Sequence, residues 1–193
     1  MIGLTGGIGS GKTTVCQIFQ SIGIPVYYAD PRAKWLMSFH RPLKNALKQA
    51  LGSDIYHRNG RLNRKAMADI IFHDKDKLEQ VNKLVHPAVH QDAAEWVKKQ
   101  TAPYIIYEAA LLIENGSYTS FDFLIVVTAP KEIRINRVMK RDNIDRKQVL
   151  ARINNQIPQG IKNLKADFLI TNDGYHSLIQ QVVEIHQQLL NRQ

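Results

Sequence analysis

Residues 6–13 read Gly6-Gly7-Ile8-Gly9-Ser10-Gly11-Lys12-Thr13 and come directly after a short apolar run, residues 1–5. The segment matches the phosphate-loop pattern G-x-x-x-x-G-K-[ST]. Glycines in this pattern let consecutive backbone N–H groups turn inward around phosphates, and a following helix adds the positive end of its dipole. The segment therefore predicts a nucleoside-triphosphate site.

The two polar residues at the end of the loop have separate expected roles. The Lys12 ammonium supplies a mobile charge for the outer phosphates, and the Thr13 hydroxyl is placed to bind Mg²⁺. We expect the phosphates to contact the whole of the loop, which comprises Gly7, Ile8, Gly9, Ser10, Gly11, Lys12, Thr13 and Thr14.

Composition predicts one compact globular core. The chain has 193 residues, 44% of them hydrophobic, which is enough for one core with small appended subdomains. Its single cysteine, Cys16, excludes an internal disulfide and is expected to be a small buried hydrophobe. We see no basic leader, export signal or apolar run of about 18 residues. A cytoplasmic location without a membrane partner is the expectation.

The positive charge is concentrated in one segment. The net charge is +9, and residues 131–165 hold ten Lys or Arg against three Asp or Glu. A groove for single-stranded nucleic acid usually interleaves aromatic residues for base stacking, and residues 131–165 contain none. We therefore expect arginines directed at phosphates and no nucleic-acid partner, with a solvated basic helix face as the alternative.

Short apolar runs alternate with helical patterns along the chain. The runs predict strands over residues 2–5, 25–29, 103–108, 123–128 and 168–171. Helices are predicted over residues 12–22, 64–72, 76–99, 130–141, 145–156 and 175–191, the first with Val15, Ile18, Phe19 and Ile22 on one face. The alternation indicates an α/β phosphate-loop fold with a five-stranded parallel sheet flanked by helices, whose ligands bind at the carboxyl ends of the strands.

Two insertions interrupt this alternation. Residues 31–100 are helical in pattern and could hold the second substrate, so we assign them to a substrate domain. Residues 140–165 carry several basic side chains and are predicted to form a lid that closes over the phosphates and excludes water. The nucleotide-binding core would then comprise residues 1–30, 101–139 and 166–193.

Two carboxylates are predicted at the carboxyl ends of strands. Asp30 is expected to end the second strand, where it could accept a proton from an attacking hydroxyl or help to hold Mg²⁺. It precedes Pro31, so a helix N-cap is an equally good interpretation. Glu108 ends the third predicted strand, where it could coordinate Mg²⁺ through water, contact the acceptor or only cap the next segment.

Four further residues are candidates with structural alternatives. Arg137 and Arg141 share a helix face and could present two guanidiniums to a polyphosphate. Asn172, in the segment after the last strand, could lie where a nucleobase is read, or belong to an ordinary Asn-Asp-Gly turn. His86, before Pro87 in a long helical pattern that the proline stops or kinks, could be a ligand or a structural side chain.

Taken together, several separated segments resemble the dephospho-coenzyme A kinase family over essentially the whole chain. They are the extended loop over residues 3–14, Ala29-Asp30, His86-Pro87, Leu111-Leu112-Ile113-Glu114, Arg141-Asp142, Gln156, and Ala166-Asp167 through Asn172. The resemblance implies transfer of the γ-phosphoryl group of ATP, with Mg²⁺, to the ribose 3′-hydroxyl of dephospho-coenzyme A. It also implies that Asp30 is the catalytic base. We expect Asp30, His86, Glu108 and Leu111 to contact the acceptor.

The chain departs from the family pattern at two places. Tyr28 stands where the family often has a first aspartate before Ala29-Asp30, and Glu108-Ala109-Ala110 lacks the proline that commonly precedes the Leu-Leu pair. Two other functions stay open: a different small-molecule kinase, and a nucleotide-dependent switch or nucleic-acid-binding ATPase. ATP is preferred over GTP on the resemblance, and we expect a monomer or a weak homo-oligomer.

Overall fold

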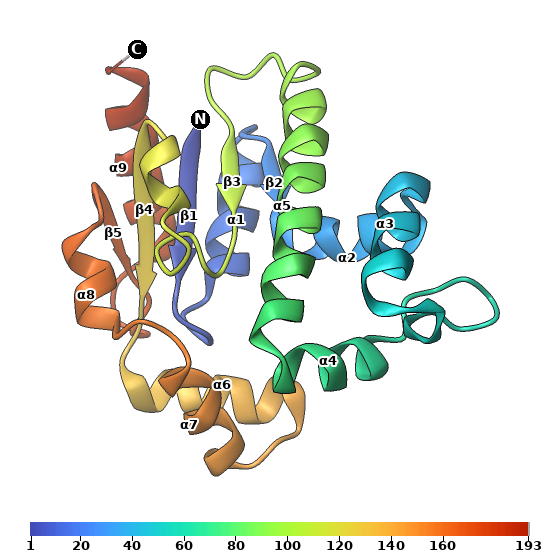
Figure 1. The fold of residues 1–193 in the computed structure, drawn as a ribbon. Helices are drawn as coiled ribbons and strands as arrows, with labels where there is room; N and C mark the ends of the chain where they lie inside the picture. The colour runs from blue at the N-terminus through green and yellow to red at the C-terminus, as the bar shows by residue number, and fades with distance from the viewer. Residues whose placement is uncertain (193) are drawn as a thin grey trace. The chain divides into compact units, whose positions relative to one another are not determined.

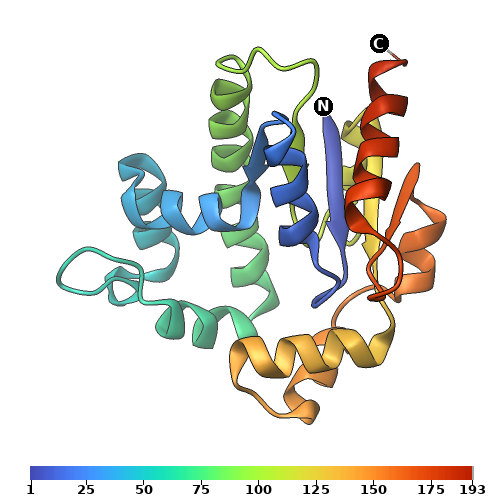
Figure 2. The same ribbon diagram turned by 180° about the vertical axis from the view of Figure 1, so that it is seen from behind.

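The computed structural model describes residues 1–192, with the side chains at 72 and 73 excepted. The chain forms two compact units (Figures 1 and 2). The first combines Met1–Tyr28 with the chain from Gln100 onward, and the second is Ala29–Lys99. Each unit has its own buried side chains and is described by itself below.

The first unit is built on a five-stranded sheet. Its strands are β1 (Ile2–Gly6), β2 (Val26–Tyr28), β3 (Ile106–Glu108), β4 (Phe123–Thr128) and β5 (Phe168–Thr171). Their order is β2-β3-β1-β4-β5, and neighbouring strands pair in parallel. The predicted fold class is confirmed, although two strands are shorter than expected. The second strand ends at Tyr28 and so excludes Asp30, which corrects that part of the prediction.

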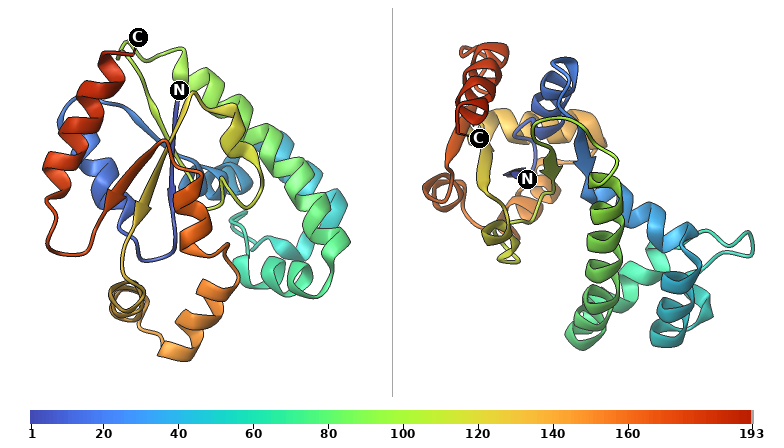
Figure 3. Two further views of the ribbon diagram at one scale, coloured as in Figure 1. Left: turned by 90° about the vertical axis from the view of Figure 1, so that its left-hand side faces the viewer. Right: turned by 90° about the horizontal axis from the view of Figure 1, so that it is seen from above.

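Helices cover both faces of the sheet. The helices α1 (Lys12–Ser21) and α9 (Leu178–Leu190) lie side by side on one face, as Figure 2 shows. On the other face lie α8 (Gln159–Leu164) and a 3₁₀ turn, Ser117–Ser120 (Figure 3, left). The central strands are therefore buried on both sides, which explains why β1 and β4 read as continuous apolar runs.

The buried face of α1 agrees with the predicted one except at its end. Val15, Cys16 and Phe19 are fully buried against the sheet and α9, whereas Ile22 is exposed because the helix ends at Ser21. Burial, with a smaller effect from the nearby Glu108 charge, raises the pKa of the Cys16 thiol above its ordinary value. Cys16 is thus the expected buried hydrophobe.

Two helices lie beyond the carboxyl ends of β1 and β4 (Figure 1). They are α6 (Lys131–Asp142) and α7 (Arg146–Asn154), and α7 begins with a capping box at Asp145. The two helices share a small apolar cluster of buried residues, against which Ile8 of the phosphate loop packs. The predicted helix over residues 145–156 therefore ends earlier, and α8, which follows Pro158, was not predicted.

The second unit is predominantly helical. Its helices are α2 (Ala29–Phe39), α3 (Arg41–Leu51), α4 (Arg64–His73) and α5 (Lys75–Val97), with a 3₁₀ turn at Ser53–Ile55 and an isolated antiparallel bridge between Tyr56 and Leu62. Valines at every fourth position, followed by an alanine, bury one stripe of α5: Val81, Val85, Val89 and Ala93. This continuous packing explains why α5 runs through Pro87, which the sequence had predicted to stop or kink it.

Among the described residues, none of the helices combines the length and hydropathy that a membrane-spanning segment requires.

Candidate active site

The phosphate loop connects β1 to α1 in a conformation that only glycine accommodates at two points. Gly9 and Gly11 have φ angles of 78° and 99°, in the left-handed region. A Cβ atom at Gly9 would collide with the backbone of Arg134, and one at Gly11 would collide with the Asn172 side chain. The loop is therefore shaped both by its own backbone and by residues more than a hundred positions away.

Lys12 lies across the start of the loop. Its Nζ donates to the Gly6 carbonyl at 3.1 Å and is 4.0 Å from Glu108 Oε1. Both side chains are largely buried, with exposed fractions of 14% and 9%. Glu108 pairs in register with Leu4 and Tyr28, so the end of β3 fixes its position beside the lysine. Next to Lys12, in the first turn of α1, Thr13 is exposed.

Asn172 and Arg137 support the loop from its outer side. The Asn172 side chain donates from Nδ2 to the Ser10 carbonyl at 2.9 Å and accepts at Oδ1 from Arg137 at 3.0 Å. Arg137 Nη1 also donates to the carbonyls of Gly9 and Ser10, both at 3.5 Å. The oxygen and the nitrogen of the Asn172 amide thus each bind a protein group.

Arg141 has a different environment from Arg137. Its guanidinium donates to both carboxylate oxygens of its neighbour Asp142, at 2.7 and 3.1 Å. Arg152 of α7 binds the same carboxylate at 2.6 Å. The two arginines hold the pKa of Asp142 below its ordinary value, mainly through the hydrogen bond from Arg141. This cluster ties the end of α6 to α7.

Arg134 is a site residue that the sequence analysis missed. It is 5% exposed, and its Nε donates to the Ile8 carbonyl at 2.9 Å. Burial lowers the pKa of this guanidinium. The sequence could have indicated Arg134, because it lies three residues before Arg137 and therefore on the same helix face. Arg134 and Arg137 therefore form one row along α6 that faces the loop carbonyls.

Two glutamines complete the surroundings of the loop. Gln156 Oε1 accepts from the Ile8 backbone N–H at 2.8 Å, and Gln159 Oε1 accepts from the Gly7 N–H at 3.3 Å. Gln156 was singled out only through the family resemblance, and Gln159 was not predicted. No local pattern could have identified Gln159, because its partner lies 152 residues away.

The other predicted residues lie in the turn after β3, in α2 and in α5. Leu111 is 47% exposed in the turn that follows β3, in the same unit as the loop. Asp30 and His86 belong to the helical unit and are both exposed. Asp30 lies within the first turn of α2, which begins at Ala29, so it does not occupy the N-cap position that was the structural alternative. His86 lies in the uninterrupted helix α5.

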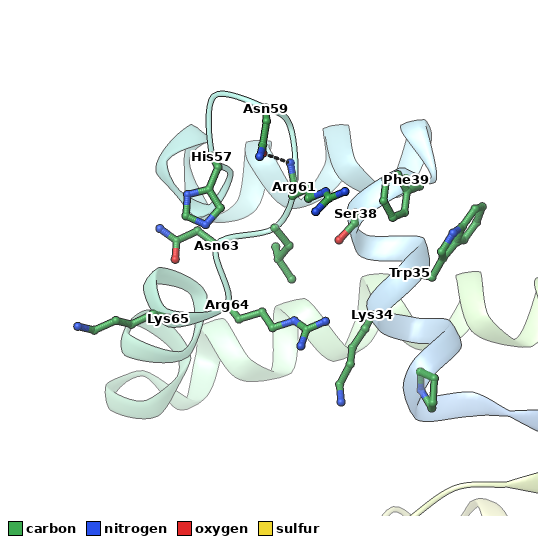
Figure 4. A pocket seen from close by; sticks show the side chains of 12 residues that line it. Lys34, Trp35, Ser38, Phe39, His57, Asn59, Arg61, Asn63, Arg64 and Lys65 are labelled. Atoms are coloured by element: carbon green, nitrogen blue, oxygen red, sulfur yellow. Dashed lines mark hydrogen bonds between the residues drawn. The ribbon is translucent and has the colours of Figure 1, made fainter. Parts of the chain in front are cut away.

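The helical unit contains a pocket of about 1020 Å³ (Figure 4). One wall is a single face of α2, and the other is the loop leading into α4. The lining residues are Pro31, Lys34, Trp35, Ser38, Phe39, His57, Asn59, Arg61, Leu62, Asn63, Arg64 and Lys65. They include four Lys or Arg residues and no carboxylate, together with two aromatic rings that are about half exposed. This combination suits an anionic ligand that also has an apolar or aromatic part.

Comparison with known proteins decides between the candidate functions. The family model described as dephospho-CoA kinase (CoaE) matches residues 1–177. The chain belongs to the dephospho-CoA kinase family. A dephospho-CoA kinase from Porphyromonas gingivalis is 40% identical over 185 residues, which cover 95% of this chain and 91% of that protein.

Two solved structures from the comparison share the fold over nearly the full length. A Thermus thermophilus protein has a TM-score of 0.85 at 32% identity, covering 99% of this chain and 96% of that one. Dephospho-CoA kinase from Campylobacter jejuni has a TM-score of 0.71 at 25% identity, with 99% and 97% coverage. These comparisons confirm the family resemblance that the sequence indicated. The activity is that of a dephospho-CoA kinase, which catalyses the final step of coenzyme A biosynthesis. The nucleic-acid-binding ATPase and the kinase of another small molecule are set aside.

If Asn172 supports the phosphate loop of this kinase, Asn172→Ala should weaken ATP binding about tenfold or more, because a lost buried hydrogen bond costs about 1–3 kcal/mol. Isothermal titration with a non-hydrolysable ATP analogue would measure this. Asn191→Ala, at the exposed end of α9, is the control and should bind normally. Normal binding by the Asn172 variant would show that the loop keeps its shape without this side chain.

Proposed function

We propose that the phosphate loop binds ATP and that Asp30 receives the proton of the attacking hydroxyl of dephospho-coenzyme A. The ribose 3′-oxygen would form the new bond to the γ-phosphorus while the bond to the β–γ bridging oxygen breaks and ADP leaves. Phosphoryl transfer of this kind depends on positioning and on charge stabilisation more than on covalent chemistry. The observation that carries the proposal is the lysine of the loop, whose ammonium lies beside both Gly6 and Glu108.

Lys12 would move from the Gly6 carbonyl to the outer phosphates when ATP binds. A lysine side chain can make this change because its ammonium is a compact charge on a flexible stem. Glu108, 4.0 Å from the ammonium, would keep it at the end of the sheet during the change. Arg137 would act on the transferred group through the loop that it supports, whereas Arg141 would contribute charge only after leaving Asp142.

Mg²⁺ is expected to bind together with ATP. The Thr13 hydroxyl is an exposed oxygen donor next to Lys12, which suits a hard cation that also takes phosphate oxygens as ligands. Among the described residues, no group of three His, Cys, Asp or Glu side chains could hold a metal by itself. When bound, the ion would neutralise charge on the β- and γ-phosphates.

The pocket in the helical unit is our candidate for part of the acceptor site. Lys34, Arg61 and Arg64 would bind the acceptor's phosphates, and the rings of Trp35 and Phe39, 5.5 Å apart, would contact its apolar part. In Figure 4, Arg64 extends toward α2, whereas Lys65 extends away from it. His86 and Leu111 stay predicted acceptor contacts. The lid over residues 140–165, adenine reading near Asn172 and the cytoplasmic location also stay predictions.

A coupled ADP-release assay with ATP and Mg²⁺ tests the function directly. We expect ADP release with dephospho-coenzyme A and none with AMP, adenosine or shikimate, and a product that mass spectrometry identifies as coenzyme A. Lys12→Ala should abolish nearly all of this turnover. Preference for another acceptor, or unchanged kinetics in the variant, would contradict the proposed substrate or the proposed site respectively.

Asp30→Asn tests the base. We expect turnover to fall about a hundredfold or more, the usual scale of general-base catalysis, while ATP affinity changes little. Asp76→Asn makes the same change in the first turn of α5, in the same unit, and should leave turnover unaltered. Steady-state kinetics at saturating substrates would distinguish them, and near-normal turnover in Asp30→Asn would remove Asp30 from the mechanism.

Arg64→Met tests the acceptor pocket. Loss of a charge-assisted contact should raise the KM for dephospho-coenzyme A about tenfold and leave the KM for ATP unchanged. Lys83→Met is the matched control, since this cation of α5 is 74% exposed at its side chain and does not line the pocket, and its KM values should stay normal. Equal effects of the two variants would indicate general electrostatic attraction rather than a contact in the pocket.

A further inference from the structure

The most deeply buried charge in the described part of the chain belongs to a residue that has no role in the site described above. Lys162 of α8 is 0% exposed, and its Nζ is 2.5 Å from Glu114 Oε1. Glu114 lies in the turn after β3 and is itself 15% exposed at its side chain. The pair therefore joins two segments that are 48 positions apart in the sequence.

As a source of stability this ion pair is poor. Burying two charges costs several kcal/mol per ion unless additional hydrogen bonds satisfy them. In the part of the chain that the structure describes, neither Lys162 Nζ nor Glu114 Oε2 has a hydrogen-bond partner of good geometry. Two apolar side chains would fill the same space at lower cost. What the ion pair contributes is a defined position for α8.

The same carboxylate also holds the chain just before α8. Glu114 Oε1 accepts from the Ile157 backbone N–H at 3.3 Å. Ile157 follows Gln156, and Gln159 begins α8, so Glu114 contacts the chain between the two glutamines whose oxygens accept from the phosphate loop. Gln159 Oε1 also accepts a hydrogen bond from Arg134 Nη1, at 3.4 Å.

We propose that Glu114 and Lys162 are positioning residues for ATP binding, acting through Gln156 and Gln159. The ion pair fixes residues 156–162, and the two carboxamide oxygens then satisfy the N–H groups of Ile8 and Gly7 at the start of the loop. A loop held in this way loses less conformational freedom when the triphosphate binds. The inference rests on the proposed ATP site and concerns the nucleotide side alone.

A pair of methionines separates positioning from stability. Lys162→Met and Glu114→Met singly leave an unpaired buried charge, so each should lower the melting temperature by several degrees. The double variant removes both charges and should recover most of that loss. We nevertheless expect its KM for ATP to stay about tenfold above normal, with the KM for dephospho-coenzyme A within about twofold. Lys165→Met, at the exposed end of α8, is the control and should match the wild type.

A second set of variants tests the route through the glutamines and does not depend on how the methionine variants fold. Gln156→Ala with Gln159→Ala should raise the KM for ATP by a similar factor. Adding the methionine pair should then cause little further increase, because residues that act through one contact are not additive. Normal ATP kinetics in the double methionine variant, or in the glutamine variant, would overturn the proposal. An inactive wild-type enzyme would instead contradict the proposed function.

Discussion

A trans peptide that turns its N–H toward a phosphate turns its carbonyl the opposite way, and the phosphate loop has to satisfy both sides at once. Gln156 and Gln159 accept from the N–H groups of Ile8 and Gly7, and the carbonyls on the opposite side of the loop need donors from elsewhere. Arg134, Arg137 and Asn172 supply them by donating to the carbonyls of Ile8, Gly9 and Ser10. Helix α6 positions the two arginines, and the edge strand β5 ends directly before Asn172.

This requirement changes the interpretation of the basic segment over residues 131–165. The concentration of charge predicted arginines directed at phosphates. In the structure, Arg134 and Arg137 donate to backbone carbonyls of the loop. Arg141, Arg146 and Arg152 pair with carboxylates of α6. The arginine side chains of these pairs are between 49% and 61% exposed, and each pair contributes little stability. The excess charge therefore lies around the loop, and only part of it is in position to act on a phosphate.

The sequence predicted the features that depend on local pattern. The phosphate loop, the parallel sheet and the long helix α5 follow from glycine spacing and apolar periodicity, which neighbouring residues determine. It could not predict Gln159 or the buried Lys162, because their partners are between 25 and 152 residues away and no spacing rule connects them. The end of the second strand was wrong for a related reason. Ala29 and Asp30 form the start of helix α2, and their intrinsic propensities did not distinguish a strand end from a helix start.

Helix α2 also relates the proposed base to the proposed acceptor pocket. Asp30 lies in its first turn, and the pocket takes Lys34 and Ser38 from the same face, at intervals of four residues. A helix rises about 1.5 Å per residue, so Asp30 and Lys34 are about 6 Å apart along its axis. An acceptor phosphate bound at Lys34 would then set the distance of the attached ribose from the Asp30 carboxylate, within one rigid element. Under this arrangement, a change that bends α2 between these two residues would lower turnover even if both substrates still bound.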